Sequence, residues 1–156
     1  MIVREITDVD PSLVEQIVAL EQDAFGIGGM NHWFLVPFIR HGRVFIVCRG
    51  DEVVGVCEYM LDFRCPDQAY LFGFTVKSCW RRRGVGERLL RESCSILKQE
   101  GIKLIALTVH PENTGARRLY EKLGFVQTGF HKDEYGPGED RLEYVLELEN
   151  PKEKML

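Results

Sequence analysis

The chain has 156 residues, of which 45% are hydrophobic and 28% charged, and its formal net charge is -4 at pH 7. This length supplies one hydrophobic core, so we expect a single domain over residues 1–149 and a flexible tail over 150–156, and the acidic balance excludes a general attraction to nucleic acid. The first residues contain no apolar leader, no segment has the roughly 18 consecutive apolar residues of a membrane span, and five cysteines form no CxxC pair. We therefore expect a soluble cytoplasmic protein that has no disulfide framework and no metal site.

Segments typical of strands and helices alternate along the chain. The patterns predict strands over residues 2–7, 43–50, 52–63, 68–76, 102–110, 125–130 and 141–149, and helices over residues 11–25, 30–42, 84–101 and 113–124. Asp10 and Asn113 are suitable helix caps, and Pro37 is expected to interrupt the second helix. This order predicts an α/β domain with a mixed central sheet, in which the N-terminal strands are antiparallel and helices form the later crossovers on both faces.

A basic turn stands between the strand that ends at Val76 and the helix that begins near Val85. Arg81–Arg83 add positive charge there, although the chain as a whole is acidic. Gly84 and Gly86 lack the Cβ atoms that would keep an anion away from the backbone N–H groups. Because a helix N-terminus also carries the positive end of the helix dipole, the turn favours phosphate binding. A solvated basic corner is the alternative.

Two motifs resemble those of the GNAT superfamily of acetyl-CoA-dependent N-acetyltransferases. "RRRGVG" resembles the signature [QR]-x-x-G-x-[GA], and "NTGARRLYEKLGF" resembles N-x-x-[AS]-x-x-x-Y-x-x-x-G-F, with a helix and a strand between them as in the family. The preceding "FGFTV" is similar to the family's splayed fourth strand. The likeness extends over residues 10–148 and is closest to the branch that acetylates the N-terminal alanine of a ribosomal protein. The resemblance implies a GNAT fold with splayed middle strands and acetyl-CoA as co-substrate.

The resemblance also assigns cofactor-binding residues. Backbone groups of Phe74, Thr75 and Val76 would lie along the pantetheine arm, and Asn113 would lie near the same arm. The pyrophosphate would be bound by the turn and the first residues of the helix: Arg81, Arg82, Arg83, Gly84, Val85, Gly86 and Glu87. The hydroxyl of Tyr120 would lie near the sulfur and protonate the departing thiolate. Its spacing also fits an ordinary buried core tyrosine, which is the alternative.

The general base is not identified by the motifs. The ribosomal branch has a glutamate where this chain has Thr108, which cannot accept a proton at neutral pH. His110 lies on the same strand face, and Tyr70 stands eleven residues before Arg81, as does the tyrosine base of eukaryotic N-terminal acetyltransferases. Glu58 is a third candidate and would act through water. For each of the three candidates, an ordinary strand residue is the alternative.

The absent glutamate also bears on the acceptor. At pH 7 on the order of a tenth of an α-amine is neutral, against under about a thousandth of a lysine side chain, so a weak base favours an α-amine. We therefore expect direct transfer of acetyl to a protein or peptide N-terminus, without an acyl-cysteine, by a monomer or homodimer. The enzymatic alternative is a small-amine acetyltransferase that holds a polyamine, amino acid or antibiotic with Glu134, Glu139 and Asp140. The non-enzymatic alternative is a nucleic-acid-binding or regulatory module that uses the basic turn.

Overall fold

A computed structural model describes residues 1–148 of the chain, and the tail expected over 150–156 lies outside these residues. The backbone contacts divide the chain into two compact units, of which the first comprises Met1–Met60 with Phe72–Ser93 and the second comprises Leu61–Leu71 with residues 94–148. The single domain expected from the chain length stays a prediction. No helix within the described residues is long and apolar enough to cross a membrane.

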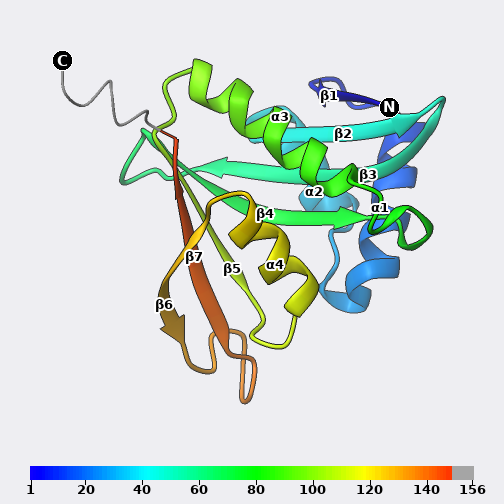
Figure 1. Cartoon of the computed structure of the whole chain (residues 1–156). Coiled ribbons are helices and arrows are strands. Elements are labelled where there is room, and N and C mark those ends of the chain that lie inside the picture. The colour runs from blue at the N-terminus through cyan, green and yellow to red at the C-terminus, as the bar shows by residue number, and fades with distance from the viewer. Residues whose placement is uncertain (149–156) are drawn as a thin grey trace. The chain divides into compact units, whose positions relative to one another are not determined.

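The first unit begins with an antiparallel sheet covered by helices. Its elements are β1 (Ile2–Ile6), α1 (Pro11–Phe25), the short 3-10 helix η1 (Gly26–Gly28), α2 (His32–His41), β2 (Arg43–Arg49), β3 (Glu52–Leu61) and the 3-10 helix η2 (Ser78–Trp80) (Figure 1). β2 pairs antiparallel with both β1 and β3, as the sequence predicts. β4 (Gln68–Val76) and α3 (Val85–Gln99) each contribute residues to both units.

Local signals account for the ends of the first two helices. The Asp10 carboxylate accepts a hydrogen bond from the Leu13 N–H (3.0 Å), and Pro11 starts α1. Asn31 caps α2. The expected interruption at Pro37 is wrong, because α2 runs through this residue. Proline there removes the hydrogen bond to the carbonyl of Trp33, which lies in the first turn of α2.

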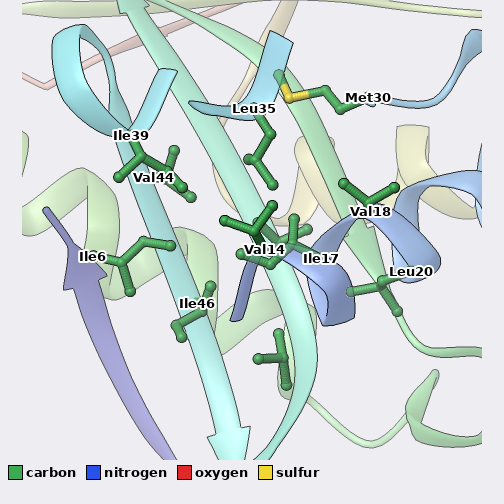
Figure 2. Packing of buried hydrophobic residues seen from close by; sticks show 12 residues of the cluster. Ile6, Val14, Ile17, Val18, Leu20, Met30, Leu35, Ile39, Val44 and Ile46 are labelled. Atoms are coloured by element: carbon green, nitrogen blue, oxygen red, sulfur yellow. The ribbon is translucent and has the colours of Figure 1, made fainter. Parts of the chain in front are cut away.

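The core of the first unit joins both helices to the strands. Figure 2 shows side chains of α1, α2, β1 and β2 packed against one another. The cluster consists of Ile6, Val14, Ile17, Val18, Leu20, Met30, Leu35, Ile39, Val44, Ile46, Val53 and Val56. Burial of these apolar side chains is the main favourable term that stabilises α1 against the sheet.

The second unit contains the parallel pairing of the fold. Its further elements are β5 (Leu104–Val109), α4 (Thr114–Lys122), β6 (Val126–His131) and β7 (Arg141–Glu147). The start of β4 pairs parallel with β5 over Gln68–Tyr70, which agrees with the expected splay of the middle strands. β7 pairs antiparallel with β5 and β6, so the hydrogen-bonded strand order is β1-β2-β3-β4-β5-β7-β6. The predicted mixed α/β sheet is confirmed.

Candidate functional site

The basic turn follows a constrained backbone path from β4 to α3. The Arg81 Nε donates to the carbonyl of Val76 (3.0 Å), so this side chain closes the turn onto the strand end. Arg82 and Gly84 both have positive φ angles, of 60° and 77°. The Arg88 N–H then donates to the Gly84 carbonyl (3.1 Å), which begins the α3 hydrogen-bond ladder.

This path fits an anion. An L-residue in the left-handed region costs roughly 1–2 kcal/mol, so Arg82 stores strain where glycine would not. A Cβ atom on Gly84 would meet no atom within 4 Å, so glycine is required by its φ angle and the space beside it is open. Left-handed turns and helix N-termini both direct N–H groups into a concave surface that suits phosphate.

The other residues assigned to the cofactor flank this turn. Phe74 is half-buried at the end of β4, where Thr75 and Val76 are buried. Gly86 and Glu87 lie in the first turn of α3, and the Glu87 carboxylate accepts from the Arg91 Nε (3.1 Å). Their contacts with pantetheine and pyrophosphate stay predictions.

A buried pair of carboxyl groups lies beside β4 in the first unit. Glu58 on β3 is fully buried and Glu21 on α1 is 3% exposed. A methyl group on Gly73 would overlap Oε2 of Glu58 and lie 3.4 Å from Oε1 of Glu21, so both carboxyl groups converge on the same point of the strand. The sequence reasoning named Glu58 but missed Glu21. The sequence does contain a signal for the burial of Glu21, because this residue falls seven positions after Val14 and therefore lies on the buried face of α1.

Burial raises the pKa of both of these acids. Burial is the larger cause that raises the pKa of Glu58 well above its ordinary value, and the charge of Glu21 raises it further. Burial also raises the pKa of Glu21, against a lowering contribution from the N–H of Met30, which lies 3.4 Å from its Oε2. Within the described residues, three carboxyl oxygens of the pair have no hydrogen-bond donor. One proton retained between the two acids would supply a donor, so the pair favours a singly protonated state.

In the second unit, Tyr70 contacts the residue that replaces the expected glutamate. The Tyr70 hydroxyl and the Thr108 hydroxyl lie 3.0 Å apart. Burial raises the pKa of Tyr70, and Tyr135 and Glu134 in the β6–β7 connection act in the same direction. A raised pKa leaves less phenolate at neutral pH, which makes Tyr70 a poorer general base.

His110 and Asn113 follow β5. His110 lies one residue beyond the end of β5, so its predicted position within the strand is wrong. Its Nδ1 accepts from the Glu112 N–H (3.1 Å), which places the proton of a neutral ring on Nε2 and occupies the free lone pair. The Asn113 side chain accepts from the Ala116 N–H (3.2 Å), so the predicted cap of α4 is confirmed and its cofactor contact stays a prediction.

Tyr120 lies in an aromatic environment on α4. It is 6% exposed, and its ring centroid is 5.6 Å from that of Phe125 and 6.4 Å from that of Tyr144. These contacts satisfy the expectation for a core tyrosine. The proton-donor role is compatible with them and stays a prediction.

The sequence of the chain matches that of a known protein family over most of its length. Residues 13–125 match the sequence pattern of the acetyltransferase (GNAT) family. The chain belongs to this family. GNAT proteins of known structure have the same fold: the ribosomal-protein-S18-alanine N-acetyltransferase from Escherichia coli has a TM-score of 0.77 at 20% identity over 96% of both chains. An aminoglycoside 6'-N-acetyltransferase complexed with coenzyme A has a TM-score of 0.83 at 17% identity over 97% of this chain and 99% of its own.

Curated GNAT relatives are similar over part of their length. The ribosomal protein bS18-alanine N-acetyltransferase of Escherichia coli (strain K12) is 30% identical over 80 residues, which are 51% of this chain and 54% of that protein. Mycothiol acetyltransferase of Corynebacterium glutamicum (strain R) is 30% identical over 92 residues, 59% of this chain and 31% of that protein. N-alpha-acetyltransferase 30 of Xenopus laevis is 29% identical over 85 residues, 53% of this chain and 31% of that protein. The chain thus spans about half of the first relative and about a third of the other two.

Because Glu21 and Glu58 are buried, we expect the free energy of unfolding of this GNAT chain to depend on pH. Because the folded pKa of Glu58 lies above its ordinary value of 4.5, its full contribution to stability is present below pH 4.5 and is lost as the pH rises toward the folded pKa. Glu58→Gln should remove this loss, so the free energy of unfolding of the variant should exceed that of the wild type by an increasing margin above pH 4.5, with a slope of up to about 1.4 kcal/mol per pH unit. Urea unfolding from pH 4 to 8 measures the margin.

The exposed Glu112 provides the control for this experiment, since Glu112→Gln removes an acid of the same type from the surface. Its stability curve should parallel that of the wild type. A Glu58→Gln curve that also runs parallel to the wild type would contradict the inferred state of the pair.

Proposed function

We propose that the chain transfers an acetyl group from acetyl-CoA to a primary amine, and that this amine is the N-terminal α-amine of a protein or peptide. The observation that carries the proposal is the turn before α3, in which Arg82 and Gly84 have positive φ angles. We propose that this turn binds the pyrophosphate of the coenzyme. Membership of the GNAT family supports the reaction type. One relative is named as a ribosomal protein bS18-alanine N-acetyltransferase and another as an N-alpha-acetyltransferase, which supports the acceptor class.

Each half of the cofactor would meet a different part of the chain. The pyrophosphate would bind the backbone of Arg82–Glu87, and the pantetheine arm would follow Phe74–Val76, with Asn113 near it. The open space beside Gly84 supports the first of these contacts. The coenzyme supplies an activated thioester, and no metal is part of the proposed reaction.

Among the candidate general bases, the buried acids are best suited to accept the proton of the acceptor amine. Tyr70 has a raised pKa, and the Nδ1 lone pair of His110 is occupied, so both are weaker candidates than Glu58. We propose that a singly protonated Glu21–Glu58 pair accepts one proton from the ammonium form of the acceptor through water, because neither carboxyl group is exposed. The neutral amine then forms the C–N bond as the C–S bond breaks, and Tyr120 gives its proton to the thiolate. The acylated nitrogen loses its second proton through water, and this proton restores the Tyr120 hydroxyl and leaves a neutral amide.

Two features of the surface support a polypeptide acceptor over a small amine. Large apolar side chains are exposed along the end of α1, η1 and the start of α2, namely Phe25, Ile27, Trp33 and Phe34. Two of the acids that the small-amine alternative requires already have partners: Glu139 pairs with Arg141 (3.3 Å) and Asp140 accepts from the Asp133 N–H (2.8 Å).

A thiol-release assay with acetyl-CoA tests the proposed reaction. Peptides with free N-termini should be acetylated faster than the same peptides with blocked N-termini and an internal lysine, because more of an α-amine is neutral at pH 7. Mass spectrometry of the product locates the acetyl group. Faster turnover of spermidine or an aminoglycoside than of every peptide would favour the small-amine alternative. Salt-dependent binding of oligonucleotides without thiol release would favour the non-enzymatic module.

The assignment of Tyr120 predicts that binding and turnover separate. Tyr120→Phe keeps the ring and its packing, so melting temperature and acetyl-CoA affinity should change little. Loss of the positioned proton donor should lower kcat by roughly 10²-fold when chemistry limits the rate. A purely structural tyrosine would instead lose about 1 kcal/mol of stability for a lost buried hydrogen bond and keep its kcat. A kcat within twofold of the wild type therefore refutes the donor role.

The assignment of the acid pair predicts a pH-dependent loss of turnover. Glu58→Gln should lower kcat/KM for a peptide acceptor by about 10²-fold at pH 7, and the deficit should shrink as the pH passes the amine pKa near 8, where the free amine no longer needs a base. Because the same change is expected to raise stability at neutral pH, unfolding cannot explain the loss. Glu112→Gln is again the control. A constant deficit at all pH values, or none, would exclude the pair as the proton acceptor.

A further inference from the structure

Two arginines of the first unit lie against the same tryptophan. The guanidinium carbon of Arg49, at the end of β2, is 4.8 Å from the ring centroid of Trp80, and that of Arg83 is 5.1 Å from the same ring. Both distances lie within the range of cation–π contacts. The Trp80 indole thus contacts two guanidinium groups, one from β2 and one from the basic turn.

Within the described part of the chain, no carboxylate neutralises either of these two guanidinium groups. Arg49 and Arg83 have no carboxylate partner among residues 1–148, and both are exposed. Other basic side chains of this region are engaged in the following way: Lys77 with Glu52, Arg81 with the carbonyl of Val76, Arg88 with Glu92 (2.8 Å), and Arg91 with Glu87 (3.1 Å). Two like charges that share one ring repel each other unless an anion lies between or beside them.

The coenzyme of the proposed function carries a suitable anion. Coenzyme A has a phosphate on the 3' position of its adenosine ribose, and this group is separated from the pyrophosphate by a single sugar. Arg83 belongs to the turn in which we placed the pyrophosphate, so the next anionic group along the ligand should meet side chains that are attached to this turn. Guanidinium groups bind phosphate oxygens through paired N–H donors.

We infer that Arg49 and Arg83, supported by Trp80, bind the 3'-phosphate of coenzyme A. This inference rests on the proposed function and adds a subsite to it. It assigns the side chain of Arg83, which the sequence placed at the pyrophosphate, to the adenosine end of the ligand, while the Arg83 backbone stays with the pyrophosphate. Trp80 is a positioning residue in this arrangement, because it limits the rotamers of both arginines before the ligand arrives.

Calorimetric titration of coenzyme A and of 3'-dephospho-coenzyme A tests the subsite. The wild type should bind coenzyme A at least about tenfold more tightly than the dephospho form, which is the effect of charge-assisted hydrogen bonds to one phosphate. Arg49→Gln and Trp80→Leu should each reduce this ratio by about fivefold or more, with affinity for the dephospho form within about twofold of the wild type. The ratio should also fall as the salt concentration rises.

Arg40→Gln is the matched control, since Arg40 is an exposed arginine on α2 of the same unit and its loss changes the net charge equally. It should leave the ratio unchanged. Equal affinity of the wild type for the two ligands, or an unchanged ratio in Arg49→Gln, overturns the subsite but leaves the pyrophosphate seat intact. Failure of the wild type to bind either ligand overturns the proposed function instead. Arg49 is exposed, so its substitution tests the inference even if Trp80→Leu does not fold.

Discussion

The backbone path between β4 and α3 is the constraint on which the rest of the site depends. Between Val76 and Val85 the chain must leave a strand, form a short 3-10 helix, pass through two left-handed positions and start a helix. The side chain of Arg81 is used to hold this path, because its Nε is bonded to the end of β4. What remains available for a ligand is the backbone of the turn and the guanidinium groups of Arg82 and Arg83. The turn therefore combines neutral backbone donors with side-chain charge, as recognition of a ligand with several phosphates requires.

Stability is given up at two places in the first unit. Arg82 adopts a conformation that costs an arginine more than a glycine, and Glu58 is buried without a cation beside it in the described chain. Glycine at position 73 leaves the space that the two carboxyl groups occupy. Strain and unpaired buried acids of this kind are concentrated at functional sites, which agrees with their position next to β4 and its turn.

The second unit offers a different chemistry. Where the ribosomal branch has a glutamate, the chain has a threonine whose hydroxyl contacts that of Tyr70. This pair is neutral and its phenol is made less acidic by burial, so it suits orientation of an acceptor better than removal of a proton. Proton acceptance then has to come from an acid elsewhere, and the candidate is Glu58 on β3, whose burial raises its pKa well above the ordinary value.

The sequence by itself determined the elements and the basic turn. Caps at Asp10 and Asn113, glycines with positive φ and apolar periodicity are local signals, because each depends on residues within one or two turns of the chain. The two GNAT motifs are local in the same sense, which is why the family was recognisable from the sequence.

Only the tertiary structure decided which distant side chains meet. Glu21 lies 37 positions from Glu58 along the chain, Tyr70 lies 38 from Thr108, and Arg49 lies 31 from Trp80, so no periodicity within one element relates the members of these pairs. Each contact depends on how a helix covers a strand, on the register of β4 against β5, or on where a hairpin lies relative to a turn. The charge state of Glu58 and the partners of the arginines follow from these contacts. Burial and neighbouring charges determine the pKa of an acid and the partner of an arginine, whereas residue type alone does not.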